Sequence, residues 1–520
     1  MGQLRASFVA TAFRTPPPAL PVLEGDGPPL PSPHPVPPPA LPPSVRDLLH
    51  LAARDDFDRT RATVARLGGC TRPIALTGHT TTVDVTTGEI VHAYASTEEP
   101  TGRLLLPCGN RRASRCPACS RIYAADTYHL FRAGLVGGKT VPDSVRAHPR
   151  VFATLTAPSF GPVHNRETSA TGRALRCRCQ TWHKAADPAL GAPLDPAGYD
   201  YTGAVLFNAH AGQLWARFTT QLRRELAAHG DLPQRDLPGE LRLSFAKAAE
   251  YQARGAVHFH AVIRLDGPEG PTTPPPPWAS VATLTDAIRA AAARVALPAD
   301  STATGTLQLR FGAQTDVREI TPDDGHHSDR AVAGYIAKYA TKGAEGTGTL
   351  DHPLYCTACH GRGTHETPDG RLNDCRNCDG TGQAQPPASL PVRQHTRQLI
   401  RTCWDLAQIP EFAHLNLRRF AHTLGYRGHF ATKSRRYSTT LTALRNDRRT
   451  WQTEQARIRV GRPAPDPVAT ETLASWRYDG TGYRPGEEPL AEAIRQERAT
   501  ALQLRHEAKK PARGTTACAW

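Results

Sequence analysis

The chain has 520 residues, and its 63 lysines and arginines outnumber its 48 acidic residues, which gives a formal charge of +15 and a pI near 9.5. Such a charge favours polyanionic partners, although it carries no information about fold. The sequence has no apolar run of about eighteen residues and no signal peptide, so a membrane protein and a secreted protein are excluded and a cytoplasmic location is expected. The length predicts several domains.

The first segment, residues 1–46, is rich in proline and cannot bury a core, so it is expected to be disordered or polyproline-like. Residues 47–145 form an N-terminal region that contains a cysteine cluster. Because disulfides are rare in the cytoplasm, clustered cysteines indicate metal, and zinc is the expected ion. The predicted ligands are Cys70, Cys108, Cys116 and Cys119, and the arginines inside the cluster, which are available to contact phosphate, are Arg111, Arg112 and Arg115.

Residues 146–345 alternate between strand and helix patterns. The expected elements, in chain order, are a strand at 151–157, a helix at 203–229, strands at 241–251 and 256–263, a helix at 283–295, a strand at 306–311 and a helix at 329–342. A turn at 252–255 would join the second and third strands as a hairpin. This order predicts an α+β domain that has an antiparallel sheet with helices on one face.

Three side chains of this hairpin are candidate metal ligands. Residues alternate between the faces of a strand, so His258 and His260 share one face and Phe259 points to the other. Glu250, on the preceding strand, would lie near His258. Two imidazoles and one carboxylate, with coordination positions left open, suit Mg²⁺ or Mn²⁺. The alternatives are histidines that are hydrogen-bonded in the core and a glutamate that is solvated at the turn.

The helix at 329–342 carries a Tyr-x-x-Lys unit twice. Tyr335 and Tyr339 are four residues apart and therefore stack on one helix face, with Lys338 and Lys342 close by. A phenol with a pKa of about 10 is a poor nucleophile at pH 7 unless a positive charge assists it. Two identical nucleophiles side by side indicate a reaction that is performed twice. The alternative is an amphipathic helix whose tyrosines pack and whose lysines reach water.

A second cysteine cluster lies at 350–385. Two Cys-x-x-Cys units, each followed by glycines that permit tight turns, place four thiolates around one cation and predict a tetrahedral zinc site. The ligands are Cys356, Cys359, Cys375 and Cys378. The pattern resembles the zinc region of DnaJ-type chaperones, but the likeness is too short to imply chaperone activity. For a third set, Cys177, Cys179 and His183, metal binding and free cysteines in a loop are both open interpretations.

Residues 386–460 are predicted to be basic and helical. An amphipathic segment at 416–424, a turn, and a helix capped by Ser434 resemble a helix-turn-helix that would recognise double-stranded DNA. The candidate DNA contacts are Arg427, Lys433, Arg435 and Arg436. A pair of helices that packs on the preceding domain explains the same pattern. Residues 461–520 are expected to be a mobile tail, apart from a helix at 490–508.

The histidine strand followed by the tyrosine helix resembles the HUH endonuclease superfamily of rolling-circle replication initiators, and the doubled tyrosine unit resembles its two-tyrosine class. The chain is also similar to replication initiator proteins of actinobacterial plasmids, and the stretches that carry this similarity are 106–119, 151–164 and 427–437. The resemblance implies the HUH fold, in which the histidines lie on a central strand of an antiparallel sheet and the tyrosine helix lies over them.

The resemblance also implies a mechanism and partners. With Mg²⁺ or Mn²⁺ at the histidines, Tyr335 or Tyr339 would attack the scissile phosphate of single-stranded DNA, leaving a 5′-phosphotyrosine and a free 3′-hydroxyl, and the lysines would assist by charge. The implied partners are double-stranded and single-stranded plasmid origin DNA, a host helicase and a host DNA polymerase. Two rival classes remain: a two-tyrosine transposase, and a non-enzymatic zinc-containing DNA-binding regulator.

Overall fold

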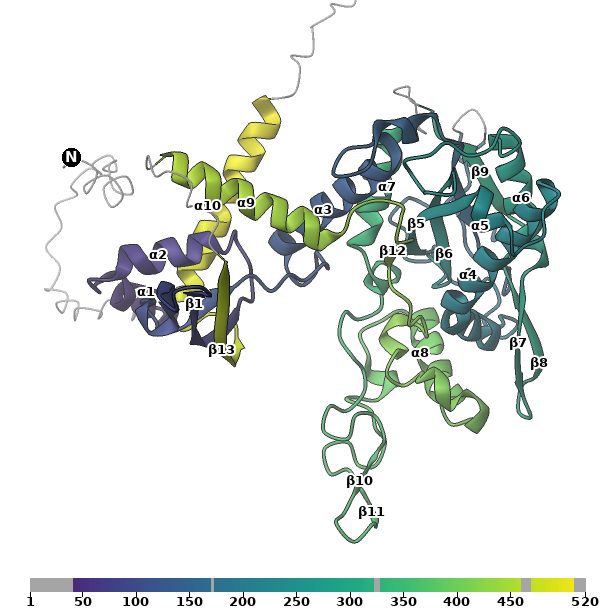
Figure 1. The fold of residues 1–520 in the computed structure, drawn as a ribbon. Coiled ribbons are helices and arrows are strands. Elements are labelled where there is room, and N and C mark those ends of the chain that lie inside the picture. The colour runs from purple at the N-terminus through teal and green to yellow at the C-terminus, as the bar shows by residue number, and fades with distance from the viewer. Residues whose placement is uncertain (1–40, 170–172, 322–327, 460–468, 509–520) are drawn as a thin grey trace, which may run out of the picture.

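The computed structural model describes residues 41–169, 173–321, 328–459 and 469–508. The chain forms two parts, an N-terminal module that also contains the end of the described chain, and a larger part built on a central sheet (Figure 1). Two helices run between these parts and pack on each other, α3 (Pro117–Val136) and α9 (Leu441–Arg459). Contact between α3 and α9 is reinforced by Asp126, a fully buried carboxylate that pairs with two arginines of α9.

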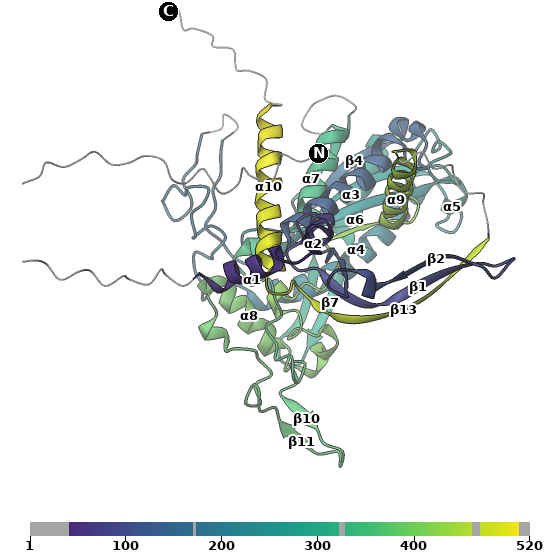
Figure 2. The same cartoon turned by 90° about the vertical axis from the view of Figure 1, so that its left-hand side faces the viewer.

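The N-terminal module takes its elements from both ends of the chain. Its four-stranded sheet has β1 at the centre, paired antiparallel with the other three strands; the strands are β1 (Ile74–Asp84), β2 (Ile90–Ala95), β3 (Leu104–Leu106) and β13 (Thr470–Thr481). Its helices, which pack together through one apolar cluster, are α1 (Pro43–Ala52), α2 (Phe57–Arg66) and α10 (Glu487–Ala508). Figure 2 shows the long, curved sheet from the side.

Two expectations for the chain ends change with this module. Over its described residues the tail is not mobile, because β13 pairs with β1 along its length and Leu490 and Ile494 of α10 are buried. These apolar positions pack on residues near the start of the described chain, such as Leu51 and Val64, which no local pattern reveals. Residues 460–468 and 509–520 lie outside the described residues, as do residues 1–40 of the proline-rich segment. Residues 43–46 belong to α1, whose first residue is a proline, as its missing N–H permits.

The central sheet has five antiparallel strands in the order β12-β5-β6-β4-β9. Their bounds are β4 (Arg150–Leu155), β5 (Arg242–Tyr251), β6 (Val257–Asp266), β9 (Thr315–Glu319) and β12 (Ala431–Lys433). The expected strands at 151–157, 241–251 and 256–263 correspond to β4, β5 and β6. The strand expected at 306–311 forms, but it lies outside this sheet, in a separate hairpin of β7 (Ala296–Ser301) and β8 (Gly305–Arg310).

Helices cover both faces of the central sheet, so the expectation of helices on one face is wrong. On one face lie α4 (Tyr201–His229) and α6 (Val281–Arg294), against a core that includes Phe259. On the other face lie α3 and α7 (Asp329–Ala340), against a second core that includes Val262. The physical reason is that β6 is buried on both faces: one face is apolar, and the other carries Val262 beside polar side chains that α3 and α7 cover.

A buried ion network lies at one end of β6. Arg264 and Asp266 are both fully buried, and the guanidinium donates two hydrogen bonds of 2.7 and 2.9 Å to the carboxylate. Ser244 donates a third hydrogen bond of 2.6 Å, and His148 Nδ1 lies 2.8 Å from the same carboxylate. Burial opposes ionisation of Asp266, but these partners outweigh it and hold its pKa below the ordinary value.

Asp266→Ala is expected to lower the free energy of unfolding by about 3–5 kcal/mol, because the Arg264 guanidinium would stay buried without its carboxylate. Urea denaturation followed by circular dichroism measures the change. The matched control is Asp286→Ala, which removes a carboxylate that is 67% exposed and should change stability by less than about 0.5 kcal/mol. Because the pKa of Asp266 is lowered in the fold, its contribution is present above the unfolded pKa of about 3.9 and is lost as the pH falls below it. Equal losses for both variants would contradict the prediction.

The helix-turn-helix expected at 416–441 is not formed. The segment 416–424 ends in a short 3-10 turn, η6 (Ala421–Thr423), and residues 431–433 form β12, which pairs with β5. Ser434 does not cap a helix, because its hydroxyl accepts a hydrogen bond of 2.9 Å from Phe245 N at the sheet edge. The helix begins later, at α9, where Thr440 Oγ1 accepts from Ala443 N. Of the basic residues of this segment, Lys433 therefore lies on an edge strand of the sheet rather than on a recognition helix.

The remaining elements complete the larger part of the molecule. The other helices are α5 (Leu237–Glu240) and α8 (Gln394–Leu406), and the short 3-10 segments are η1 (Ser96–Glu98), η2 (Asp143–Ala147), η3 (Ala344–Thr347), η4 (Pro387–Ser389) and η5 (Pro410–Leu415). A small hairpin of β10 (Thr364–Glu366) and β11 (Leu372–Asp374) projects from this part in both views (Figures 1 and 2). Within the described residues, none of the helices combines the length and the apolar character that crossing a membrane requires.

Candidate active site and cysteine clusters

The hairpin of β5 and β6 brings the three candidate metal ligands together. Antiparallel pairing sets Glu250 directly opposite His258, and His260 lies two residues further along the same face. Gly255 in the turn has a φ of +79°, a conformation that glycine adopts without strain. Phe259 points to the opposite face and joins the other core. The alternation of β6 therefore directs both imidazoles and the carboxylate toward the face that α7 covers.

The ligand atoms of this set converge. Glu250 Oε2 lies 3.0 Å from His260 Nε2 and 3.3 Å from His258 Nε2. On the neighbouring strand β4, Thr154 Oγ1 lies 3.1 Å from His260 Nδ1 and so orients the ring with its Nε2 toward the carboxylate. The ring of Phe152 stacks parallel to the same imidazole. His258 Nε2 is buried and has no hydrogen-bond partner among the described residues, so this donor set fits a divalent cation.

The protonation states of these groups also suit a cation. Burial opposes ionisation of Glu250, but the two imidazoles outweigh it and lower the pKa of the carboxyl to about 2. Burial lowers the pKa of His260, which favours the neutral ring at pH 7. An ionised carboxylate beside a neutral imidazole is the form in which these groups bind metal. The carboxylate also accepts a hydrogen bond from the hydroxyl of Tyr335 on α7.

Helix α7 holds its two tyrosines against this cluster. The helix begins after Ser328, whose side chain accepts a hydrogen bond from the first turn. The hydroxyl of Tyr335 lies 3.1 Å from His260 Nε2 and donates to Glu250 Oε2 at 3.3 Å. The ring of Tyr339 lies 4.5 Å from that of Tyr335, and its centroid is 6.1 Å from the His260 ring. The hydroxyl of Tyr335 thus contacts both His260 and Glu250, whereas that of Tyr339 interacts with Glu250, and Tyr335 is 37% exposed and open to a substrate.

Neither phenol ionises readily in this environment. Burial and the neighbouring Glu250 carboxylate both raise the pKa of Tyr335, and the same two causes raise the pKa of Tyr339. The two lysines of the helix lie beside Tyr339, because Lys342 Nζ is 4.6 Å and Lys338 Nζ is 5.7 Å from its ring centroid. Both ammonium groups thus approach the second phenol.

The arginines of the first cysteine cluster bind the end of the tyrosine helix and the segment that follows it, which differs from the expected contact with phosphate. Arg111 donates to the carbonyl oxygens of Ala340 and Lys342 at 3.1 and 2.7 Å, and these carbonyls have no further turn of helix to bind them. Arg112 donates to the carbonyl oxygen of Asp351, and Arg115 pairs with the carboxylate of the same residue at 2.8 Å. This clip fixes where α7 ends.

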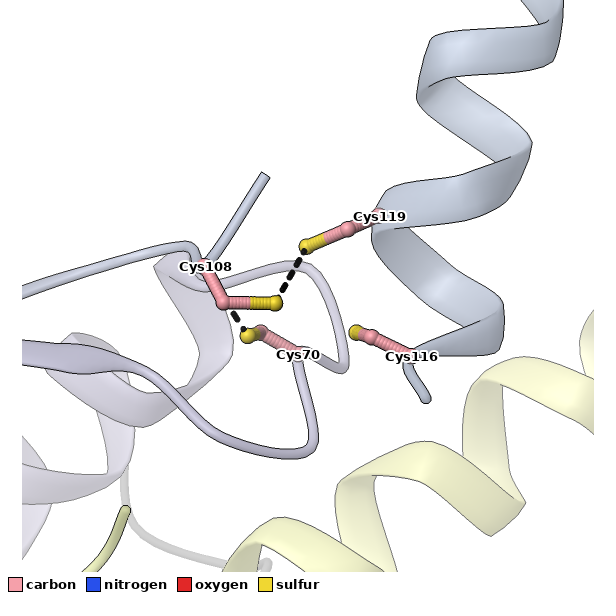
Figure 3. A group of neighbouring side chains, drawn as sticks. All are labelled: Cys70, Cys108, Cys116 and Cys119. Carbon is pink, nitrogen blue, oxygen red and sulfur yellow. Dashed lines mark hydrogen bonds between the residues drawn. The ribbon is translucent and has the colours of Figure 1, made fainter. Parts of the chain in front are cut away.

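The first cysteine cluster is assembled from three separate segments (Figure 3). Cys70 follows α2, Cys108 follows β3, Cys116 precedes α3 and Cys119 lies in the first turn of that helix. The sulfurs of Cys108 and Cys119 are 3.7 Å apart, and Cys70 Sγ accepts a hydrogen bond of 3.3 Å from Cys108 N. All four ligand atoms lie within 4.8 Å of one another, so the cluster, with Cys70 included, could hold zinc.

The second cysteine cluster is a pair of matching knuckles beside the β10–β11 hairpin. The sulfurs of Cys356 and Cys375 are 3.9 Å apart, and those of Cys359 and Cys378 are 3.7 Å apart. The glycines that follow each unit donate backbone hydrogen bonds of 3.3 and 3.2 Å to sulfur, which stabilises thiolate. All four cysteines are buried although this region has no other apolar core among its described residues. This set too could hold zinc.

The four residues expected to contact DNA in the C-terminal region do not share one role. Arg427 donates to the His414 carbonyl oxygen at 2.7 Å, and Lys433 donates to the Ser438 carbonyl oxygen at 2.8 Å. Burial lowers the pKa of Lys433. Arg435 and Arg436 are exposed after β12. Two of the four therefore hold backbone, and two face solvent.

Two functional contacts were missed by reasoning from the sequence. Thr154 is one of them, although strand alternation places it on the same face as Phe152. The clip formed by Arg111 is the other, and no sequence signal reveals it because its carbonyl partners lie more than 200 residues away. The spacing of the metal ligands and of the tyrosines, by contrast, was visible in two short local patterns.

The fold and the site define a class: an α+β protein with antiparallel sheets, in which a helix with two tyrosines lies on a cluster of two histidines and a glutamate, joined to cysteine clusters that could hold zinc. A family model described as "RepSA: Replication initiator protein, pSAM2" matches residues 56–496. The chain is also 49% identical, over 479 residues, to a replication initiator protein of Streptomyces ambofaciens, a match that covers 91% of this chain and 96% of the relative. The chain belongs to the RepSA family of replication initiator proteins. No solved structure matches it.

Proposed function

We propose that this plasmid replication initiator starts rolling-circle replication by nicking one strand at the origin and forming a 5′-phosphotyrosine bond. The observation that carries the proposal is the position of the Tyr335 hydroxyl, 3.1 Å from His260 Nε2 and within hydrogen-bond distance of Glu250. In this position the phenol lies next to the atoms that would hold a cation, as a nucleophile attacking a metal-bound phosphate must. The excess of basic residues supports a nucleic-acid partner.

The chain's own residues would share the work of this transesterification. His258, His260 and Glu250 would hold Mg²⁺ or Mn²⁺, and the bound ion would supply positive charge that polarises the scissile phosphate and offsets the Glu250 carboxylate. Tyr335 Oη would form a bond to phosphorus while the bond from phosphorus to O3′ breaks. The phenol loses one proton and O3′ gains one, so the step is balanced without water. The 3′-hydroxyl would then prime a host DNA polymerase, with a host helicase opening the duplex.

The second tyrosine would act at the end of the round. Tyr339 lies beside Tyr335 but further from the histidines, with Lys338 and Lys342 next to its ring. After the origin is regenerated, Tyr339 would cleave the new junction, and the free 3′-hydroxyl would attack the first phosphotyrosine and close the displaced strand into a circle. The lysines would position phosphate or stabilise the phenolate. The geometry thus favours Tyr335 as the first nucleophile.

A nicking assay tests the proposal. Purified full-length protein is incubated with a supercoiled plasmid that carries the replicon's own origin region, with Mg²⁺, Mn²⁺ or EDTA. We expect open-circular DNA and a covalent protein–DNA adduct that resists detergent and disappears with protease, in both metals and not in EDTA. A plasmid of equal size without the origin serves as the control.

The outcome separates the rival classes. Absence of both nick and adduct on origin plasmids would refute the endonuclease proposal and leave a DNA-binding regulator. Cleavage of transposon-end DNA, but not of the origin, would favour the transposase. The membership in a family of replication initiators and the 49% identity with one of them favour the origin as substrate.

A further inference from the structure

The long connection between β4 and α4 is irregular, so an interaction other than secondary structure must hold it in one conformation. Its described residues, 156–169 and 173–200, contain neither helix nor strand, only isolated bridges. Between Phe160 and Tyr199, which anchor its two ends in the core, Cys177 and Pro193 are the only buried apolar side chains among the described residues. A connection of this length without regular structure or an apolar core is uncommon in a compact domain. Some other interaction must compensate for the entropy of ordering it.

Four potential ligands meet inside this connection. His164 Nδ1 lies 3.2 Å from His183 Nε2, and Cys179 Sγ lies 3.3 Å from the same nitrogen. Together with Cys177, their ligand atoms all lie within 4.8 Å of one another. His164 comes from the segment that leaves the sheet, and the other three come from the segment that returns toward α4. The cluster therefore ties together two stretches that backbone hydrogen bonds also join, such as those from His164 N to Ala192 O and from Leu194 N to Pro162 O.

The surrounding groups orient the cluster for a cation. His183 Nδ1 lies 2.7 Å from the carboxylate of Asp187, which directs Nε2 toward the other three ligands. Asp187 is itself fixed, because its second oxygen accepts a hydrogen bond of 2.8 Å from Ala189 N. A carboxylate behind a histidine is the usual arrangement at zinc sites. Asn165 N donates to Cys177 Sγ at 3.5 Å, as backbone groups do around zinc thiolates.

We propose that His164, Cys177, Cys179 and His183 form a third zinc site that folds the connection between β4 and α4. Two thiolates and two imidazoles make a closed tetrahedral set, and a closed set holds zinc for structure, since it leaves no position for a substrate. Binding energy at such a site becomes folding energy for the segment that supplies the ligands. The site is separate from the two sets of four cysteines and from the His258–Glu250 cluster.

The site also shapes a cavity beside the hairpin of the active site. Arg178, which stands between two of the proposed ligands, lines a cavity of about 940 Å³ together with Arg254 of the β5–β6 turn and Arg310. Arg254 lies four residues beyond Glu250 along the chain. Because both neighbours of Arg178 would be bound to the ion, its backbone would be fixed at the cavity wall. Loss of zinc would leave the backbone of Arg178 free to move at the cavity wall.

Metal analysis of the full-length protein tests the third site independently of nicking. We expect three zinc ions per chain by mass spectrometry of the metal content, and two in the double variant Cys177→Ser/His183→Ala. The control Cys403→Ala, which removes a buried cysteine outside the clusters, should keep three. After exchange with Co²⁺, the double variant should lose part of the thiolate-to-cobalt absorption, because two of ten ligating sulfurs then lack their site. A wild-type content of two zinc ions, unchanged in the double variant, would overturn the proposal.

A milder variant and a protease provide a second test, which does not depend on the double variant folding correctly. Asp187→Asn keeps all four ligands and should release one zinc ion to a chelator about 10–100 times faster than the wild type does. Trypsin should cut after Arg178 rapidly in the double variant or after chelation, and slowly in the zinc-loaded wild type. Equal rates of zinc release and equal protection of Arg178 in all forms would refute the site. Failure of the nicking assay would leave both readouts unaffected.

Discussion

Tyr335→Phe is expected to abolish the first nick at the origin, whereas Tyr339→Phe is expected to retain it. The hydroxyl of Tyr335 lies 3.1 Å from His260 Nε2, while the Tyr339 ring stands further from the cluster. Removal of a nucleophile lowers the rate by a factor on the order of 10³ or more. Initial rates of plasmid nicking and of covalent adduct formation on a single-stranded origin oligonucleotide measure this.

The tyrosine variants must be separated from damage to the fold. Both replace a tyrosine by a phenylalanine and remove one oxygen, so each is the matched control of the other. If both variants unfold at the same temperature as the wild type, the packing of α7 is intact in each of them. Tyr339→Phe should fail later, in the closure of the displaced strand into a circle. If Tyr339→Phe lost the first nick and Tyr335→Phe kept it, the proposed order would be reversed; normal nicking by the double variant would exclude both as nucleophiles.

Cys119→Ser is expected to remove one zinc ion and to disrupt the N-terminal module. Cys119 is the candidate ligand in the first turn of α3, and its sulfur lies 3.7 Å from that of Cys108 (Figure 3). Structural zinc sites contribute about 10 kcal/mol or more to folding, far beyond a typical point mutation. Nicking should fall as well, since α3 packs along α7 and the loop before it carries Arg111. Zinc content, urea denaturation and nicking rate together measure these effects.

Arg111→Ala distinguishes the effect of losing the Arg111 hydrogen bonds at the end of α7 from the effect of losing a metal site. This variant keeps all four cysteines, so its zinc content should equal that of the wild type, while the end of α7 loses the donor to Ala340 and Lys342. We expect a loss of about 1–3 kcal/mol in stability and a smaller fall in nicking than for Cys119→Ser. If Cys119→Ser kept its zinc, the first cluster would not be a metal site; if it lost zinc but nicked normally, the link from the module to α7 would be refuted.

Much of the candidate site could be predicted because its functional residues lie close together in the sequence, at spacings that fix their common face. The spacing of His258 and His260 fixes their common face through the two-residue period of a strand, and the four-residue spacing of the tyrosines fixes theirs through the period of a helix. Glu250 follows from the length of one tight turn. The pairing of Cys-x-x-Cys units is equally local. The structure places all of these side chains in the groups that the patterns indicated.

The helix-turn-helix expected from the sequence shows where local patterns fail to predict the structure. The residues from 416 to 441 have the amphipathic and capping patterns of helices. The edge of β5, however, offers hydrogen bonds to residues 431–433, and the free energy of forming β12 there outweighs local helix propensity. His164 was likewise passed over as a ligand, because its partners begin thirteen residues later in a connection without regular structure. Local propensity determines whether a segment forms a helix or a strand only when no distant strand offers hydrogen bonds to its backbone.

The sequence by itself determined the chemical inventory of this protein: paired histidines, doubled tyrosines, two complete cysteine quartets and a basic balance of charge. Only the tertiary structure decided that helices cover both faces of the sheet, that the end of the chain completes the N-terminal module, and that the Tyr335 hydroxyl contacts His260. Periodicity is a property of neighbours along the chain, whereas strand edges, helix packing and the Arg111 clip depend on contacts between residues hundreds of positions apart, whose free energy is gained only once the whole chain has folded.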